Sequence, residues 1–151
     1  MYKILNRGDF VNNLHAQGDA SCERIDNSVL SIEAFSKLQS DSKAILLDVR
    51  TQEEWQTIGS PDLSSISRQA VKISWRRSPD MEINPHFLDE IMHILNSKQP
   101  TIYVMCRSGA RSFQASEFLK HHGFNAINIM DGFEGSTKGQ GWKNSNLPWG
   151  L

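Results

Sequence analysis

The sequence predicts an α/β fold in which helices cover both faces of a parallel sheet. Short apolar runs typical of strands alternate along the chain with helical stripes. One run, Ala44-Ile-Leu-Leu-Asp48, has no polar residue until its end, as expected for a strand buried on both faces. With 151 residues, the chain is long enough for one domain with a real core and too short for two full α/β domains.

In the first half of the chain, the clearest predicted helix covers residues 31–38. Its apolar side chains Ile32, Phe35 and Leu38 share one face. The elements predicted after it are a strand over 44–48, one helical turn over 53–55, a turn over 59–62 and a strand over 70–74.

The second half contains the strongest helical signal, from Pro85 to Asn96. Proline suits a first helical turn, and apolar residues recur every three or four positions, at Phe87, Leu88, Ile91, Ile94 and Leu95. A strand over 101–105, a helix over 112–122 and a strand over 126–130 are predicted next. The glycine-rich tail from Asp131 is predicted to be coil whose tryptophans pack back on the domain.

The domain organisation predicted is a flexible N-terminal extension over 1–28 and a single domain over 29–151. The extension is polar and irregular, with no sustained apolar period. No apolar run approaches the roughly 18 residues that span a bilayer, and the N-terminus lacks the apolar stretch of a signal peptide. We therefore expect a cytoplasmic protein without a membrane partner.

Charge and metal-ligand spacing exclude several functions. The formal net charge is -1 with 22% charged residues, which argues against both a disordered acidic tail and a basic nucleic-acid binder. The five histidines show no metal-ligand spacing, so no metal or other cofactor is predicted. Two cysteines, Cys22 and Cys106, do not make a disulfide framework and favour a reducing compartment.

The chemistry is predicted in the segment Cys106-Arg-Ser-Gly-Ala-Arg111, between a strand and a helix. In parallel sheets, sites lie beyond the carboxyl ends of strands. A short loop containing Gly109 can turn successive N–H groups inward to form an anion-binding nest. The helix N-terminus and the charges of Arg107 and Arg111 also favour a thiolate over a thiol. An inert buried cysteine is therefore the weaker interpretation.

Three motifs resemble those of rhodanese-like domains, in the same order. Leu46-Leu-Asp-Val-Arg-Thr-Gln-Glu-Glu-Trp55 is similar to their first signature, and Cys106-Arg-Ser-Gly-Ala-Arg-Ser112 is similar to their active-site loop. Asp131-Gly-Phe-Glu-Gly135 resembles the segment after their last strand. The tail resembles that of a bacterial single-domain subset. Ser60 stands where relatives often have histidine.

The resemblance implies a five-stranded parallel sheet and a sulfurtransferase reaction. Cys106 would take sulfane sulfur from thiosulfate or a similar donor, become a persulfide, and pass the sulfur to a thiol or cyanide acceptor. The N–H groups of Arg107, Ser108, Gly109, Ala110 and Arg111 would stabilise the sulfur anion.

The charged residues receive more specific roles. Arg107 would attract the charged donor, and Arg111 would close the loop. Asp48 and Arg50 would support the loop from behind, although a purely structural ion pair is the stronger interpretation.

Two other functions remain open. One is a persulfide carrier whose acceptor is a protein. The other is a relative of tyrosine phosphatases or arsenate reductases, but these use Cys-x5-Arg loops, whereas Cys106 to Arg111 is Cys-x4-Arg. A resolving role for Cys22 is the weaker alternative to a spectator. The sequence leaves the physiological donor, the acceptor and the oligomeric state open.

Overall fold

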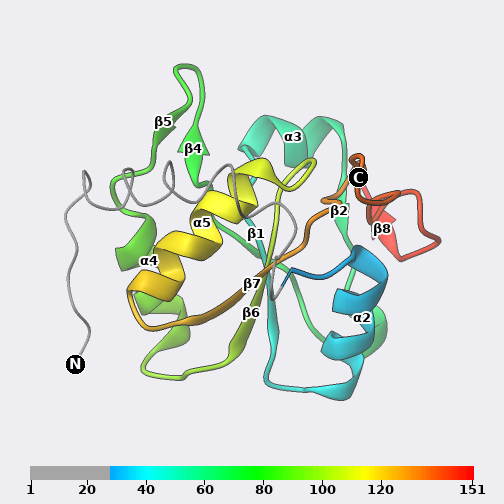
Figure 1. Cartoon of the computed structure of the whole chain (residues 1–151), viewed down its shortest axis with the longest axis horizontal. Helices are drawn as coiled ribbons and strands as arrows, with labels where there is room; N and C mark the ends of the chain where they lie inside the picture. Colours follow the sequence, from blue (N-terminus) through cyan, green and yellow to red (C-terminus); the bar gives the residue numbers. More distant parts are fainter. Residues whose placement is uncertain (1–27) are drawn as a thin grey trace.

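The computed structural model describes residues 28–151 (Figure 1). The proposed extension over 1–28, with Cys22, therefore lies outside the described residues except for Ser28. At the centre is a parallel sheet of four strands in the order β3-β1-β6-β7. These strands are β1 (Ile45–Asp48), β3 (Val71–Lys72), β6 (Thr101–Met105) and β7 (Asn125–Asn128).

The resemblance implied a fifth strand, which is reduced here to one bridge. Val29 makes a parallel bridge to Ile129 at the end of β7. Its N–H donates to the Asn128 carbonyl and its carbonyl accepts from the Met130 N–H, each at 2.9 Å. Because the chain turns into a helix two residues later, the pairing extends no further along β7.

Helices cover both faces of the sheet, as the sequence predicts (Figure 1). They are α2 (Ser31–Ser40), α3 (Gln52–Thr57), the 3-10 turn η1 (Ser64–Ile66), α4 (Phe87–Leu95) and α5 (Ala110–His121). Side chains of α4 and α5 share one core cluster with Leu47 and Val49. Those of α2 share the other with Ala44 and Leu46. The strand at 45–48 is therefore buried on both faces, which explains its continuous apolar run.

The helical stripe predicted for residues 85–96 is narrower than expected. Phe87, Ile91 and Leu95 are buried, but the side chain of Ile94 is 49% exposed. The helix turns about 100° per residue, so positions four apart stay over the sheet while residue 94 turns away. The predicted stripe was therefore wrong at Ile94.

Two short antiparallel pairs were not predicted. β4 (Arg76–Arg77) and β5 (Glu82–Ile83) form a hairpin that projects from the domain in Figure 1. β2 (Ser60–Pro61) pairs with β8 (Trp149–Gly150) at the other end of the chain. The predicted turn over 59–62 and the coil tail thus each contain strand residues. Strands of two residues are too short to show an alternating pattern.

The tail folds back over the α2 side of the sheet. The Trp142 side chain is fully buried, its ring meets that of Phe35 at 5.5 Å in a T-shaped contact, and its Nε1–H donates to the Pro148 carbonyl at 2.7 Å. Trp149 is 38% exposed.

None of the helices within residues 28–151 combines the length and the apolar character needed to cross a membrane.

Candidate active site

Cys106 lies directly after β6, where the chain bends toward the N-terminus of α5. The residue is 1% exposed. Its Sγ accepts two hydrogen bonds at 3.2 Å, one from the Gly109 N–H and one from the Ser112 hydroxyl. The first N–H groups of α5 have no intrahelical partner and give this end of the helix a positive potential. The arrangement therefore directs two hydrogen-bond donors and the positive end of α5 at the sulfur.

The loop can curl around Sγ because residue 109 is glycine. Gly109 has a φ of +104°, and a Cβ there would lie 2.4 Å from the Met130 carbonyl oxygen. Any side chain would be strained by the backbone angle and would collide with neighbouring main chain. The glycine thus lets the loop pack directly against the segment after β7.

The segment 131–135 holds the loop from outside. The N–H groups of Phe133 and Glu134 donate to the carbonyls of Cys106 and Arg107 at 2.8 and 2.9 Å. Gly132 permits this approach, since a Cβ there would lie 2.3 Å from the Arg107 carbonyl oxygen. These two carbonyls therefore point toward 131–135, while the Gly109 N–H of the loop points to Sγ.

Asp131 anchors that segment to two other parts of the molecule. The carboxylate is buried and accepts hydrogen bonds at 2.9 Å from the Ser31 N–H, the Ser31 hydroxyl and the Gly141 N–H. It joins the start of α2 to the tail. The third motif therefore acts as a support for the active loop.

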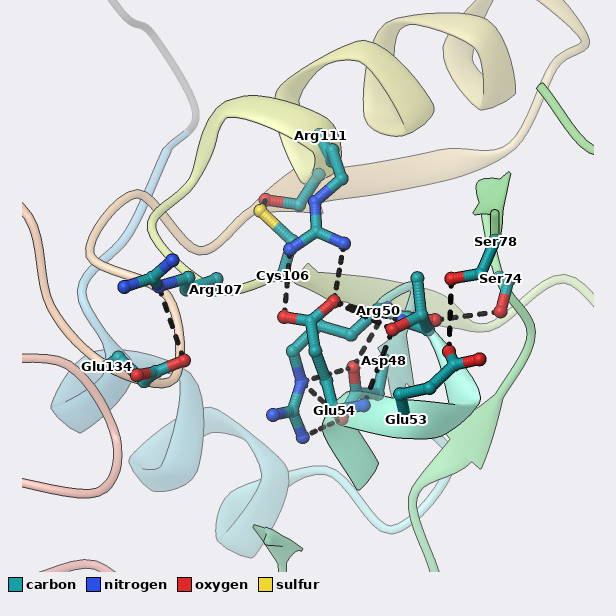
Figure 2. Close-up of polar contacts among 12 residues, drawn as sticks. Asp48, Arg50, Glu53, Glu54, Ser74, Ser78, Cys106, Arg107, Arg111 and Glu134 are labelled. Carbon is teal, nitrogen blue, oxygen red and sulfur yellow. Dashed lines mark hydrogen bonds and ion pairs between the residues drawn. The ribbon is translucent and has the colours of Figure 1, made fainter. Parts of the chain in front are cut away.

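Arg111 is held by a carboxylate from α3. Its Nη1 and Nη2 lie 2.7 and 3.0 Å from the two carboxylate oxygens of Glu54 (Figure 2). Burial opposes ionisation of Glu54, but the hydrogen bonds from Arg111 and Thr51 outweigh it and lower the pKa of the carboxyl. The same pairing raises the pKa of Arg111. This bidentate pair ties α5 to α3.

Arg107 lies at the rim of the loop and meets a second carboxylate. Its Nε is 3.4 Å from a carboxylate oxygen of Glu134, and its side chain is 66% exposed (Figure 2). The two other loop residues, Ser108 and Ala110, are also exposed. Both arginines that the sequence assigned to the site are therefore paired with glutamates from outside the loop.

Asp48 and Arg50 form a fully buried ion pair. Arg50 Nη2 lies 2.7 Å from Asp48 Oδ2 and also donates to the Gly59 carbonyl at 2.8 Å. The guanidinium carbon lies 4.3 Å from the centre of the Phe133 ring. The pair thus packs under the segment that supports the loop, and Arg50 also holds the turn at Gly59.

Three residues of the site were missed by sequence reasoning. Ser112 was assigned to the helix and not to the sulfur, although it directly follows Arg111. Glu54 is part of the first motif, but its partner lies 57 positions away. Glu134 is part of the third motif, and only the folded chain brings it to Arg107.

The segment Trp75-Arg76-Arg77 lies close to α5. Trp75 is buried, its Nε1–H donates to Gln114 Oε1, and Arg76 Nη2 donates to the same oxygen, both at 3.3 Å. Within residues 28–151, no group of three or more histidine, cysteine, aspartate or glutamate side chains is arranged to hold a metal ion.

Comparison with known proteins shows that the chain is similar to rhodanese-like domain proteins. The family model described as the STR4 middle domain matches residues 27–151. An uncharacterised protein of Rickettsia conorii is 41% identical over 124 residues, which are 81% of this chain and 95% of that protein. The rhodanese-like domain-containing protein 4 of Arabidopsis thaliana chloroplasts is 31% identical over 77% of this chain and 24% of its own length.

Two further proteins are similar to this chain. The putative sulfur carrier protein YrkF of Bacillus subtilis is 32% identical over 72% of this chain and 50% of its own length. The crystal structure of Rv0390 from M. tuberculosis superposes with a TM-score of 0.71 at 37% identity, covering 82% of this chain and 96% of that one.

Proposed function

Because this chain belongs to the rhodanese-like family, in the branch of the STR4 middle domain, we propose that it is a sulfurtransferase. It moves sulfane sulfur from thiosulfate or a similar donor to a thiophilic acceptor, either a thiol or cyanide. The sulfur is carried as a persulfide on Cys106. The reaction uses no metal and no other cofactor.

The observation that carries the proposal is the environment of Cys106 Sγ. The sulfur accepts hydrogen bonds from the Gly109 N–H and the Ser112 hydroxyl at the positive end of α5. A thiolate is the nucleophilic form of cysteine, and donors directed at the sulfur favour it. The terminal sulfur of a persulfide is also anionic, so loop N–H groups stabilise the intermediate as well.

In the first half-reaction, the Cys106 thiolate attacks the outer sulfur of the donor. Its electron pair forms the new S–S bond, and the pair of the donor's own S–S bond leaves with the departing group. With thiosulfate, the products are the Cys106 persulfide anion and sulfite. In the second half-reaction, the acceptor attacks the terminal sulfur, and the Cys106 thiolate is the leaving group. No external oxidant or reductant is needed.

The residues around the loop position it for this exchange. Arg111 holds the start of α5 to α3 through Glu54. It therefore fixes the shape of the loop 106–111 more than it contacts a donor. Asp48 and Arg50 support the loop indirectly, through Phe133. Neither ion pair supplies a group to the reacting sulfur.

A second candidate function is a persulfide carrier in a protein relay. The support is the sulfur-carrier name of the Bacillus subtilis relative. A carrier would load as an enzyme does but would discharge fastest to a cysteine of a partner protein. Comparing cyanide with protein thiols as acceptors separates the two functions.

The proposal is tested by intact mass measurement after thiosulfate treatment. We expect the wild-type protein to gain the mass of one sulfur atom and to produce thiocyanate when cyanide is added. Cys106→Ser should abolish both while keeping the circular dichroism of the fold. Cys22→Ser is the matched control and should load normally. Sulfur transfer that persists in a folded Cys106→Ser protein would remove Cys106 from the mechanism.

The same samples test the phosphatase alternative. A Cys-x4-Arg loop encloses less space than a Cys-x5-Arg loop, so we expect negligible hydrolysis of p-nitrophenyl phosphate. A protein that hydrolyses this ester well and accepts no sulfur would belong to the alternative class.

A further inference from the structure

The charged groups that flank the cysteine cancel one another. Arg111 is paired with Glu54, and Arg107 is paired with Glu134 (Figure 2). Both glutamates come from outside the loop, one from α3 and one from the segment after β7. Two positive and two negative side chains therefore lie around the loop, and neither arginine offers its full charge to a donor.

The two pairs differ in exposure. The Arg111–Glu54 pair is bidentate, and its side chains are 18% and 20% exposed. The Arg107–Glu134 pair is a single 3.4 Å contact, with the arginine 66% exposed. The backbone of Glu134 is nevertheless fixed, because its N–H donates to the Arg107 carbonyl and its carbonyl accepts from Asn144. The carboxylate therefore lies beside Arg107 at the rim of the loop.

The hydrogen-bond donors around Cys106 compensate the negative charge of only one sulfur atom. These donors, the Gly109 N–H and the Ser112 hydroxyl, point at the position of the cysteine sulfur. The sulfonate end of thiosulfate would lie beyond these donors and carry its negative charge at the rim of the loop. There Arg107 attracts it, but Glu134 repels it with a charge of equal size.

We propose that Glu134 is a specificity-determining residue that selects against doubly charged sulfane donors. It favours donors that carry one negative charge or none, the class that includes hydropersulfides of thiols. The inference rests on the proposed sulfur transfer and names its donor class. The sequence predicts that Arg107 attracts thiosulfate. Glu134, its ion-pair partner, opposes that attraction.

Thiosulfate and methanethiosulfonate form a matched pair of donors. In both, the Cys106 thiolate attacks a terminal sulfur bonded to an oxidised sulfur. The new bond joins Sγ to the transferred sulfur, and the broken bond releases sulfite from one donor and methanesulfinate from the other. Thiosulfate carries two negative charges and methanethiosulfonate carries one, so the ratio of their rates reports the charge at the rim.

The experiment compares kcat/KM for the two donors in wild type and Glu134→Gln. Glutamine keeps the size of the side chain and an oxygen that can accept from Arg107, while the main-chain hydrogen bonds stay. We expect the ratio of thiosulfate to methanethiosulfonate to rise by about fivefold at low salt and by less at high salt. Glu134→Asp should keep the wild-type ratio. Glu117→Gln, which removes a carboxylate paired with Lys120 further along α5, is the control and should also leave the ratio unchanged.

The outcomes separate this inference from the proposed function. A Glu134→Gln ratio equal to that of wild type, or a ratio that moves equally in Glu117→Gln, would overturn the role of Glu134 while Cys106 still loads. If neither donor adds sulfur to wild-type Cys106, the proposed function fails and the donor class fails with it.

Discussion

Ser112 is the side chain that most directly distinguishes this cysteine from an ordinary buried thiol. It is fully buried, and its hydroxyl lies 3.2 Å from Cys106 Sγ. Hydrogen bonds to a charged group contribute roughly 1.5–3 kcal/mol. We expect Ser112→Ala to slow sulfur loading from methanethiosulfonate by about tenfold or more, measured by rapid quench and intact mass.

The neighbouring Ser116 provides the control for Ser112. Its hydroxyl is also buried but donates to the Ser112 carbonyl at 2.7 Å, one helical turn from the sulfur. Ser116→Ala removes a buried hydroxyl from the same helix without changing a donor to Sγ. Equal slowing in the two variants would mean that the loss comes from the helix and not from the bond to sulfur.

At the same scale, the sequence could identify the nucleophile but not all of its partners. Cys106, Arg107 and Gly109 are adjacent in the chain, so one motif contains them. Glu134 reaches Arg107 only because β7 returns beside β6. Ser112 is a helical residue whose hydroxyl could equally have faced solvent, and only the curl of the loop directs it to the sulfur.

Among the elements, the pairing of α3 with α5 is a pH-sensitive contact. The pKa of Glu54 is held below its usual value of 4.5, since the hydrogen bonds from Arg111 and Thr51 outweigh burial. The pair therefore stabilises the fold fully above pH 4.5, and this contribution is lost as the pH falls through the lower folded pKa. We expect Glu54→Gln to be less stable than wild type at pH 7, and the difference to shrink below pH 4.5.

Urea unfolding at a series of pH values measures this effect. Glu117→Gln is again the control, because the 3.0 Å contact of Glu117 with Lys120 stays within α5 and does not join two elements. A stability difference for Glu54→Gln that stays constant from pH 7 to below pH 4 would contradict the assignment of the pH effect to this carboxylate.

The long elements could be predicted because their patterns match their surroundings. The strand at 45–48 is buried on both faces and reads as a continuous apolar run. The α4 helix shows a clear apolar stripe because one face packs on the sheet. By contrast, β2 and β8 have two residues each and pair across most of the chain. No local pattern encodes such a contact, so the sequence predicted a turn and a coil there.

At the scale of the whole molecule, the active loop depends on how the tail is packed. The segment 131–135, which donates hydrogen bonds to the loop, is itself held by residues later in the chain. The N–H groups of Trp142 and Lys143 donate to the carbonyls of Gly132 and Phe133, each at 2.9 Å. Because Trp142 is fully buried between this segment and α2, the core on that side of the sheet and the shape of the loop are connected.

This connection predicts how two tryptophan substitutions differ. Trp142→Ala should lower the free energy of unfolding by about 3–5 kcal/mol, as for other buried tryptophans. Trp149 is 38% exposed, and its ring lies 6.2 Å from that of Phe133 and 4.3 Å from Lys143 Nζ. Trp149→Ala should therefore lower the free energy of unfolding by less than half as much. Urea unfolding followed by circular dichroism measures both.

The same titrations show whether the tail supports the site. If segment 131–135 keeps the loop in shape, sulfur loading of Trp142→Ala should fall at a lower urea concentration than its circular dichroism, because the loop loses its support before the sheet unfolds. In Trp149→Ala, both signals should fall together. Loading that follows global unfolding in both variants would mean that the loop keeps its shape without the tail, through Gly109 and the Glu54–Arg111 pair.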